Sequence, residues 1–194
     1  MRDDAWIVVK VGGSLFDLAD LRARLTSWLA QLGEANVLIV PGGGGTADAI
    51  RILDRTHQLG EEASHWLAIQ TLSINARFLQ ALLPMARIIA EIPTSLSSLA
   101  SGWYVLDAVP FFRADELRSD HLPHVWQVTS DSLTMRVATL VKARELILLK
   151  SIDWQGDDWA EASRAGIVDG YFADALHQAP AGLRLRIVNL RAGV

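Results

Sequence analysis

The stretch NVLIVPGGGGTAD, residues 36–48, decides the fold of this chain. Its opening residues are almost continuously apolar, which is typical of a strand buried on both faces of a parallel sheet. Pro41 and four glycines then end the strand, and residues 47–58 have the composition and spacing of a helix. A buried strand that ends in glycines and opens a helix is a repeating unit of α/β proteins.

Segments of the same two kinds lie on either side of this unit. Further strands are predicted at 6–11, 88–92, 125–128, 145–150 and 183–188, and further helices at 18–32, 61–83, 130–143 and 168–178. Segment 94–124, which contains Pro110 and Pro123, has no clear assignment. Apolar strands separated by helices predict an α/β fold whose parallel sheet is covered on both faces.

The composition favours one compact domain spanning residues 1–194 and a small-molecule partner. Of the 194 residues, 51% are hydrophobic, and the net charge of −4 gives no basic footprint for nucleic acid. The chain has no cysteine, which excludes disulfides and thiolate metal sites and favours a cytoplasmic location. No apolar run approaches the roughly 20 residues that cross a bilayer. We therefore expect neither a nucleic-acid partner nor a membrane partner.

The first glycine turn is KVGGS, residues 10–14, at the end of the first predicted strand. Gly12 and Gly13 expose backbone amides beside Lys10, and the helix that follows favours anions at its N-terminus. This combination predicts a phosphate cradle with a cation beside it. An ordinary strand-to-helix turn with a solvated lysine is about as common for so short a motif, so both interpretations stand.

The second glycine turn comprises Gly42 to Gly45, with Asp48 and Arg51 on the helix that follows. Four consecutive glycines cost conformational entropy, so we expect a ligand to approach the backbone closely here. Neither turn matches the phosphate-binding pattern GxxxxGK[ST] or the dinucleotide pattern GxGxxG. The sequence therefore indicates a different class of phosphate-binding fold.

The third motif is VTSDSLT, residues 128–134, at another strand-to-helix junction. Ser130 or Asp131 could cap the helix, and Asp131 could instead orient a lysine or a bound metal. Because ligands bind at the carboxyl ends of parallel strands, the three motifs are expected to form a single site.

Taken together, KVGGS, PGGGGTADAIR (41–51), TSDSLTMRVATL (129–140) and ELILL (145–149) resemble the amino acid kinase superfamily in order and spacing. The resemblance implies a three-layer αβα sandwich with a mainly parallel sheet, and phosphoryl transfer from ATP with Mg²⁺. It also implies an acceptor side at about 1–125 and a nucleotide side at about 126–194. SHWLAI (64–69) and HVWQVTSDS (124–132) most resemble the archaeal-type kinases of methanofuran biosynthesis, which phosphorylate an aminomethylfuran phosphate.

Carried over residue by residue, the resemblance implies that Lys10 contacts the transferring phosphoryl group and that Asp131 orients the cations. His65 and Asn75 are implied on the acceptor side. The expected phosphate and nucleotide set is Gly12, Gly13, Ser14, Gly42, Gly43, Gly44, Ser130, Ser151 and Asp153. The expected substrate set is Gly45, Asp48, Arg51, His65, Asn75, Trp126 and Thr129.

The chain departs from the superfamily pattern in its last third. Lys150 stands where a threonine is usual, and residues 166–174 lack the late lysine of the family. One hypothesis is that Lys150 is a catalytic residue that supplies the missing charge. The alternative is a surface lysine whose stem lies along the sheet edge. The chain also stops before the closing strands of many relatives, which implies a shortened nucleotide half.

These departures leave two alternatives to a kinase of aminomethylfuran phosphate. The same chemistry could act on N-acetylglutamate, carbamate, UMP or isopentenyl phosphate, because loops rather than the fold choose the substrate. The chain could also be a nucleotide-binding regulatory or storage subunit with weakened catalysis.

Two lesser features carry expectations of their own. His121 and His124 could suggest a metal pair, but no third ligand of the right kind is clustered nearby and the stretch contains Pro123, so no metal site is expected. The apolar stripe Leu67, Thr71, Ile74, Phe78 and Leu82 predicts core packing or a subunit contact. A homodimer is expected from the resemblance and from the frequency of two-fold oligomers.

Overall fold

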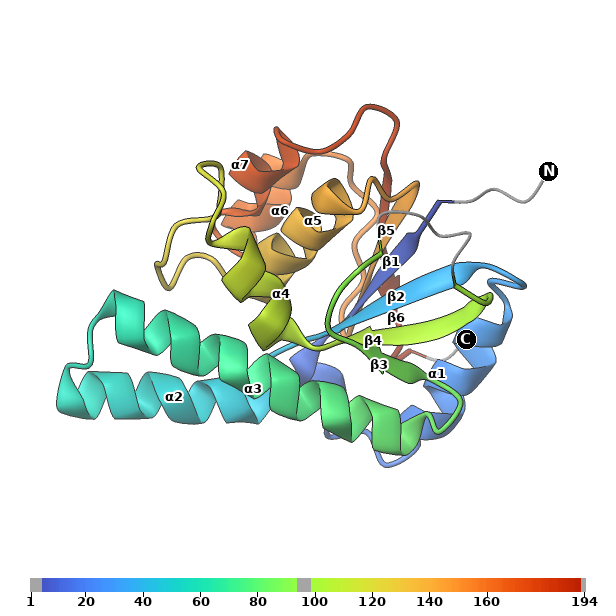
Figure 1. Ribbon diagram of the computed structural model, residues 1–194, viewed down its shortest axis with the longest axis horizontal. Helices are drawn as coiled ribbons and strands as arrows, with labels where there is room; N and C mark the ends of the chain where they lie inside the picture. Colours follow the sequence, from blue (N-terminus) through green and yellow to red (C-terminus); the bar gives the residue numbers. More distant parts are fainter. Residues whose placement is uncertain (1–4, 94–98, 193–194) are drawn as a thin grey trace.

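The computed structural model describes residues 5–93 and 99–192, and its centre is a six-stranded sheet in the order β3-β4-β2-β1-β5-β6 (Figure 1). All five strand pairs are parallel. The strands are β1 (Ile7–Val11), β2 (Asn36–Pro41), β3 (Arg87–Ile89), β4 (Gly102–Leu106), β5 (Glu145–Lys150) and β6 (Arg184–Asn189). The predicted strands at 6–11, 36–40, 145–150 and 183–188 are confirmed, and the strand predicted at 88–92 is shorter.

Helices cover both faces of the sheet, so the predicted three-layer αβα arrangement is confirmed (Figure 1). Alternate residues of β1 enter two separate cores, with Val8 on one face and Val9 on the other. One face carries α1 and the C-terminal part of α3, and the other carries α4 to α7. The helices are η1 (Gly13–Leu15), α1 (Leu21–Ala30), α2 (Gly44–His57), α3 (Glu61–Leu82), α4 (Ala108–Asp115), α5 (Ser130–Leu140), α6 (Trp159–Arg164) and α7 (Phe172–Leu176).

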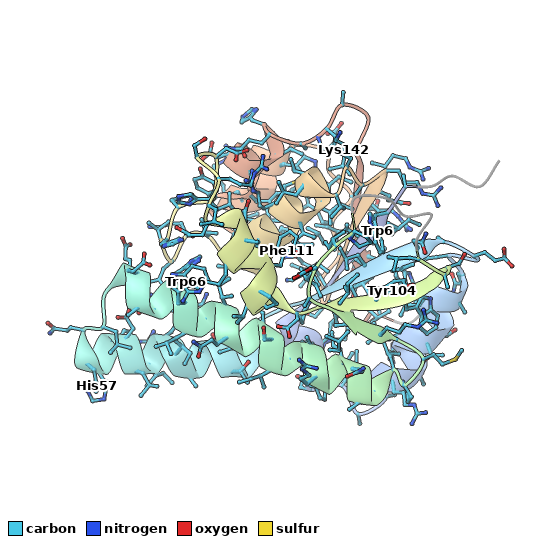
Figure 2. The ribbon with its side chains drawn as sticks, in the orientation of Figure 1. Trp6, His57, Trp66, Tyr104, Phe111 and Lys142 are labelled. Carbon is cyan, nitrogen blue, oxygen red and sulfur yellow. The ribbon has the colours of Figure 1, made fainter. Side chains whose placement is uncertain are left out.

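Helices α2 and α3 form a hairpin that projects beyond the edge of the sheet (Figure 1). The turn between them includes Gly60, whose φ of 84° favours glycine. His57 lies at the far end of α2, near the tip of the hairpin (Figure 2). The tip of the hairpin, where this turn lies, therefore consists of the last turns of α2 and the first turns of α3.

The strand predicted at 125–128 is wrong. The chain makes a turn there, in which the Val128 amide donates to the Val125 carbonyl over 3.0 Å. The alternation of apolar residues in VWQV suggested a strand, but these side chains pack against a cavity instead of a neighbouring strand. Residues 116–129 contain neither helix nor strand.

Strand β4 and helix α4 both fall in the segment that had no clear assignment. Pro110 is the third residue of α4, where its missing N–H has no partner within the helix to lose. Residues 94–98 of the same segment lie outside the described residues. Helix α6 was not predicted, and the helix predicted at 168–178 is reduced to the five residues of α7.

None of the helices in the described ranges combines the length and the apolar character that crossing a bilayer demands.

Candidate active site

A cavity of about 210 Å³ opens at the carboxyl ends of β1, β2 and β5. Both glycine turns, the start of α3, the turn at 125–128 and the first residue of α5 form its walls. Twelve predicted site residues line it, namely Lys10, Gly12, Gly13, Ser14, Gly43, Gly44, Arg51, His65, Trp126, Thr129, Ser130 and Lys150. The three motifs therefore meet at one edge of the sheet, as the sequence predicts.

Two lysines converge on one buried carboxylate at the floor of this cavity. The Lys10 ammonium lies 2.9 Å from Oδ1 of Asp131. The Lys150 ammonium lies 2.6 Å from Oδ2 of the same carboxylate and also donates to the Ile167 carbonyl over 2.5 Å. All three charged side chains are almost completely buried, so Lys150 is not a surface lysine. Two positive charges and one negative charge leave the floor with a net positive charge.

The ionisation of this group follows from its burial and its charges. Burial acts to raise the pKa of Asp131, but the two ammonium groups outweigh it and hold the pKa below the usual range. Burial and the nearby Lys10 ammonium lower the pKa of Lys150, although Asp131 acts in the opposite direction. An additional anion in the cavity would relieve the repulsion between the two lysines.

Two helices begin at the cavity. Gly43 and Gly44 at the start of α2, and Thr129 and Ser130 at the start of α5, all line it. The first amides of a helix have no partner within the helix, and the helix dipole favours negative charge there. With the lysine pair below them, these helix starts form a site suited to a polyphosphate.

The glycine amides do not all face the cavity. The Gly12 amide donates to the Leu149 carbonyl and the Gly42 amide donates to the Val11 carbonyl, each over 2.8 Å. These two amides continue the sheet ladder between neighbouring strands, so in this structure they already have acceptors and do not point at the cavity. Gly13, Gly43 and Gly44 remain as the candidates for phosphate contacts.

The glycines are also required by the contact between the two turns. A Cβ atom on Gly13 would lie 2.1 Å from the Gly44 nitrogen, and one on Gly42 would lie 2.5 Å from the Gly13 nitrogen. Gly44 has a φ of 54°. Close approach of a ligand was the expected reason for the four glycines, but packing of one turn on the other accounts for two of them, Gly42 and Gly44. A Cβ on Gly45, by contrast, would meet nothing within 4 Å.

Several predicted site residues lie outside the cavity lining. Buried Asn75 donates to the carbonyls of Gly42 and Gly43 over 2.7 and 2.8 Å, so it holds the second glycine turn from behind. Asp48 is exposed and pairs with Arg51. The Ser151 hydroxyl contacts the Ser14 hydroxyl at 3.0 Å, and Asp153 accepts from Asn189. Gly45 is exposed and also lies outside the lining.

Asp169 is a structural support that the sequence analysis missed. Its Oδ2 accepts from the Thr129 amide, the Thr129 hydroxyl and the Ser132 amide at 2.8–3.0 Å. Its Oδ1 accepts from the Ser132 hydroxyl and the Tyr171 amide. Asp169 therefore caps α5 from a distant segment, whereas a cap from Ser130 or Asp131 was one of the two alternatives that the sequence left open. Its position 37 residues after Ser132 gave no local signal.

The side of the cavity formed by α2, α3 and the turn at 125–128 contains aromatic and ionisable side chains. Burial lowers the pKa of His65 to about 4, with the neighbouring His124 acting in the same direction, so His65 is neutral near pH 7. The Arg51 guanidinium lies over the Trp126 ring at 5.1 Å. The Trp126 indole donates to Asp54 over 2.8 Å, which is the main reason that the pKa of Asp54 is lowered. Glu61, also missed by the sequence analysis, lines the same side.

A third side chain that could bind a metal lies beside His121 and His124. Glu116 precedes His121 by only five residues, and its Oε2 lies 2.9 Å from His124 Nε2. Glu116 directly follows α4, and the irregular segment after it brings the two histidines back to its carboxylate.

Comparison with known proteins places these features in a family. Residues 5–153 match the amino acid kinase family. The curated [5-(aminomethyl)furan-3-yl]methyl phosphate kinase of Methanocaldococcus jannaschii is 27% identical over 153 residues, a match that covers 75% of this chain. The chain spans 66% of the length of that relative.

Solved structures share the fold at low sequence identity. The uridylate kinase of Archaeoglobus fulgidus has a TM-score of 0.60 at 17% identity and covers 90% of this chain and 86% of its own. The UMP kinase of Ureaplasma parvum has a TM-score of 0.62 at 12% identity and covers 96% of this chain and 90% of its own. The family match supports a phosphotransferase. The chain belongs to the amino acid kinase family, and the motifs at its strand ends and the order of its sheet agree with that membership.

Proposed function

We propose that this chain transfers the γ-phosphoryl group of ATP to a small metabolite that is itself phosphorylated or acidic, with an aminomethylfuran phosphate as the leading acceptor. The observation that carries the proposal is the convergence of Lys10 and Lys150 on Asp131 beneath two helix N-termini. Phosphoryl transfer gains most of its rate from positioning and from stabilising charge on the phosphoryl oxygens.

In this proposal the two lysines act on the phosphoryl group from neighbouring strands. Asp131 holds both ammonium groups in place, so little reorganisation is needed when the anion arrives. Gly13, Gly43 and Gly44 supply backbone amides from the cavity wall. Lys150 takes the place of the late lysine that residues 166–174 lack.

The residues present suit a magnesium ion that arrives with the nucleotide. Among the described residues that line the cavity, Glu61 is the one carboxylate, and both oxygens of Asp131 contact lysines. Mg²⁺ retains water and needs few protein ligands when phosphates supply the rest. Once bound, it would neutralise charge on the nucleotide phosphates.

The acceptor side fits a substrate that has an anionic group and an aromatic or cationic part. A phosphate acceptor is already anionic near neutral pH and needs no strong general base. His65, whose pKa is lowered to about 4, would be only a weak base. Arg51 can pair with an acceptor phosphate, Trp126 can stack on a ring, and the Glu61 carboxylate can pair with an amine. The name of the Methanocaldococcus relative specifies a substrate with a furan ring, an aminomethyl group and a phosphate.

A substrate panel tests the proposal. The purified chain is incubated with ATP and Mg²⁺ and, in turn, with aminomethylfuran methyl phosphate, UMP, N-acetylglutamate, carbamate and isopentenyl phosphate. Mass spectrometry then detects any product that is heavier by one phosphoryl group. We expect the aminomethylfuran diphosphate, and we expect Lys10→Ala to lower turnover ~100- to 1,000-fold.

Other results would assign a different function. Turnover of another acceptor alone would keep the chemistry and change the substrate. Binding of ATP in a calorimeter without any product on the whole panel would favour a regulatory or storage subunit.

A homodimer is part of the proposal. Ile74 on α3 is 60% exposed, and Phe78 one turn later is 38% exposed and contacts Phe16 edge to face. An exposed apolar stripe on a long helix is typical of a subunit contact.

A further inference from the structure

Three of the five histidines of the chain gather at one place outside the lysine site. His65 on α3 stacks on His124 with ring centroids 3.9 Å apart, and His121 lies next to His124. Glu62 on α3 and Glu116 after α4 contact the same rings. The cluster, defined as Glu62, His65, Glu116, His121 and His124, joins α3 to the segment 116–129.

The hydrogen bonds of His124 indicate which of its ring nitrogens carries the hydrogen. Its Nδ1 lies 2.5 Å from Glu62 Oε2, and its Nε2 lies 2.9 Å from Glu116 Oε2. A neutral imidazole has one N–H, so it can donate to one carboxylate at a time. Glu62 is itself held by the Trp66 indole, which donates to Glu62 Oε1 over 2.8 Å. The anchored Glu62 is therefore the natural acceptor for Nδ1–H, which leaves the Nε2 lone pair directed at Glu116.

The tautomer of His121 follows from a simpler argument. Its Nδ1 lies 2.9 Å from the Leu122 carbonyl oxygen. A carbonyl oxygen can only accept, so Nδ1 carries the hydrogen and Nε2 of the neutral ring has the lone pair. That Nε2 lies 3.7 Å from Glu116 Oε1. Both histidines thus direct an Nε2 lone pair toward the same carboxylate.

We infer that Glu116, His121 and His124 form a site for one divalent transition-metal ion of the zinc type. One ligand atom from each residue lies within 4.8 Å of the others. Zinc bonds of about 2.0–2.2 Å require ligand atoms roughly 3.3 Å apart, so modest side-chain movement closes the set. Two imidazoles and one carboxylate suit Zn²⁺, Co²⁺ or Ni²⁺ better than Mg²⁺, which prefers oxygen ligands.

The surroundings of the cluster support this assignment. A carboxylate that accepts from the far nitrogen of a ligating histidine orients the ring and strengthens the ligand, and Glu62 stands in that position. His121 and Glu116 are each about one-third exposed, so an ion can enter from solvent. In Figure 2, Trp66, the anchor of Glu62, lies on the side of α3 that faces α4.

An ion at this place would stiffen the acceptor wall of the cavity. Residues 116–129 have no regular structure, and the same segment carries Val125 and Trp126 into the cavity lining. His65, which stacks on His124, also lines the cavity. A bound ion ties that segment to α3 through Glu62 and thereby positions Trp126. Its loss should change acceptor KM more than kcat.

Metal uptake by tag-free protein tests the inference. The chain is stripped with a chelator, dialysed against Zn²⁺ or Co²⁺ and analysed by elemental mass spectrometry and visible absorption. We expect about one ion per chain, a Co²⁺ spectrum typical of imidazole ligation, and a Tm raised by ~5 °C at saturating Zn²⁺. Excess Mg²⁺ should not displace the ion.

Matched variants distinguish this site from adventitious binding. His121→Ala and His124→Ala should abolish uptake, and Glu62→Gln, which keeps the shape of the side chain, should weaken it ~10- to 100-fold. His57→Ala, an exposed histidine near the hairpin tip (Figure 2), should leave uptake unchanged. The inference is overturned if the wild-type chain takes up no stoichiometric Zn²⁺ or Co²⁺. It is equally overturned if Glu62→Gln and His121→Ala bind the ion as tightly as His57→Ala does, with circular dichroism showing them folded.

Discussion

The Lys150 ammonium lies 2.6 Å from the Asp131 carboxylate, although Lys150 is the last residue of β5 and Asp131 is the second residue of α5. The contact brings a lysine from the strand end to the floor of the cavity, opposite Lys10. Removal of one of two preorganised cations should raise the barrier for phosphoryl transfer. We expect Lys150→Ala to lower kcat ~100- to 1,000-fold in the kinase assay.

A matched control for this substitution is Lys142→Asn. Lys142 is exposed and has a φ of 50°, which asparagine tolerates better than most residues. The control should keep wild-type turnover. Unchanged turnover in Lys150→Ala would show instead that Lys150 is only a structural partner of Asp131.

Asp131 should contribute to stability as well as to activity. Asp131→Ala leaves two buried ammonium groups without their shared partner, which should cost ~3 kcal/mol or more in the free energy of unfolding. Urea denaturation followed by circular dichroism measures this loss. A loss below about 1 kcal/mol would mean that water reaches the two lysines.

The same carboxylate should give stability a pH dependence in acid. Its pKa in the folded chain lies below the ordinary value of 3.8, so its contribution is complete above about pH 3.8 and is lost as pH falls through the lowered value. Urea midpoints of the wild type and of Asp131→Asn, measured from neutral pH into acid, should converge at the acid end. Parallel curves would contradict the lowered pKa.

Alanine substitutions in the two glycine turns should have opposite effects on the stability of the chain. Gly45→Ala adds a Cβ in open space within the first turn of α2, where alanine stabilises a helix by up to about 1 kcal/mol. Gly13→Ala puts a Cβ 2.1 Å from the Gly44 nitrogen and should destabilise the chain by at least 1–3 kcal/mol. Thermal melts of the two variants compare them directly. Equal melting temperatures would mean that the turns separate freely.

Asp169 should act on the proposed nucleotide site without contacting it. Asp169→Ala removes the distant cap of α5 and should cost ~0.5–2 kcal/mol. Because Thr129 and Ser130 line the cavity, KM for ATP should rise more than kcat falls. Asp174→Ala, at an exposed position in α7, is the control. An unchanged KM together with a lowered melting temperature would limit Asp169 to stability.

The proposed dimer predicts a change in mass for a single substitution. Ile74→Asp puts a charge on the exposed stripe of α3 and should convert the dimer to monomer. Light scattering coupled to gel filtration measures the mass. Leu117→Asp, at a residue that is 90% exposed elsewhere, should leave it unchanged. A monomeric wild type would refute the dimer.

The elements that could be predicted from the sequence are those whose residues must be apolar because they are buried inside the sheet. Strands β1, β2 and β5 are buried on both faces, and this leaves a continuous apolar run that needs no other context. The turn at 125–128 shows the limit, because its alternating apolar residues face a cavity rather than a sheet. The helix α4 was hidden by Pro110, which is harmless only in a first turn.

The site was predicted where its residues follow strands directly. Lys10, Gly13 and Lys150 come together because the carboxyl ends of parallel strands share an edge. Asp131 joins them from the first turn of α5, although no strand directly precedes that helix. Asp169 reaches α5 from 37 residues away, and His124 meets Glu62 of α3 from 62 residues away, so sequence spacing carries no signal for these two contacts. The roles assigned to the lysines and to Asp131 stay predictions until the variants are assayed.

The contact between Gly13 and Gly44 also bears on how this protein can change over generations. Each backbone fills the space that a side chain on the other would need, so neither position can vary while its counterpart stays fixed. Libraries randomised at one turn alone should return glycine, and grafting a single loop from a distant homologue should fail unless both loops are transplanted together. The two turns are thus inherited as one unit.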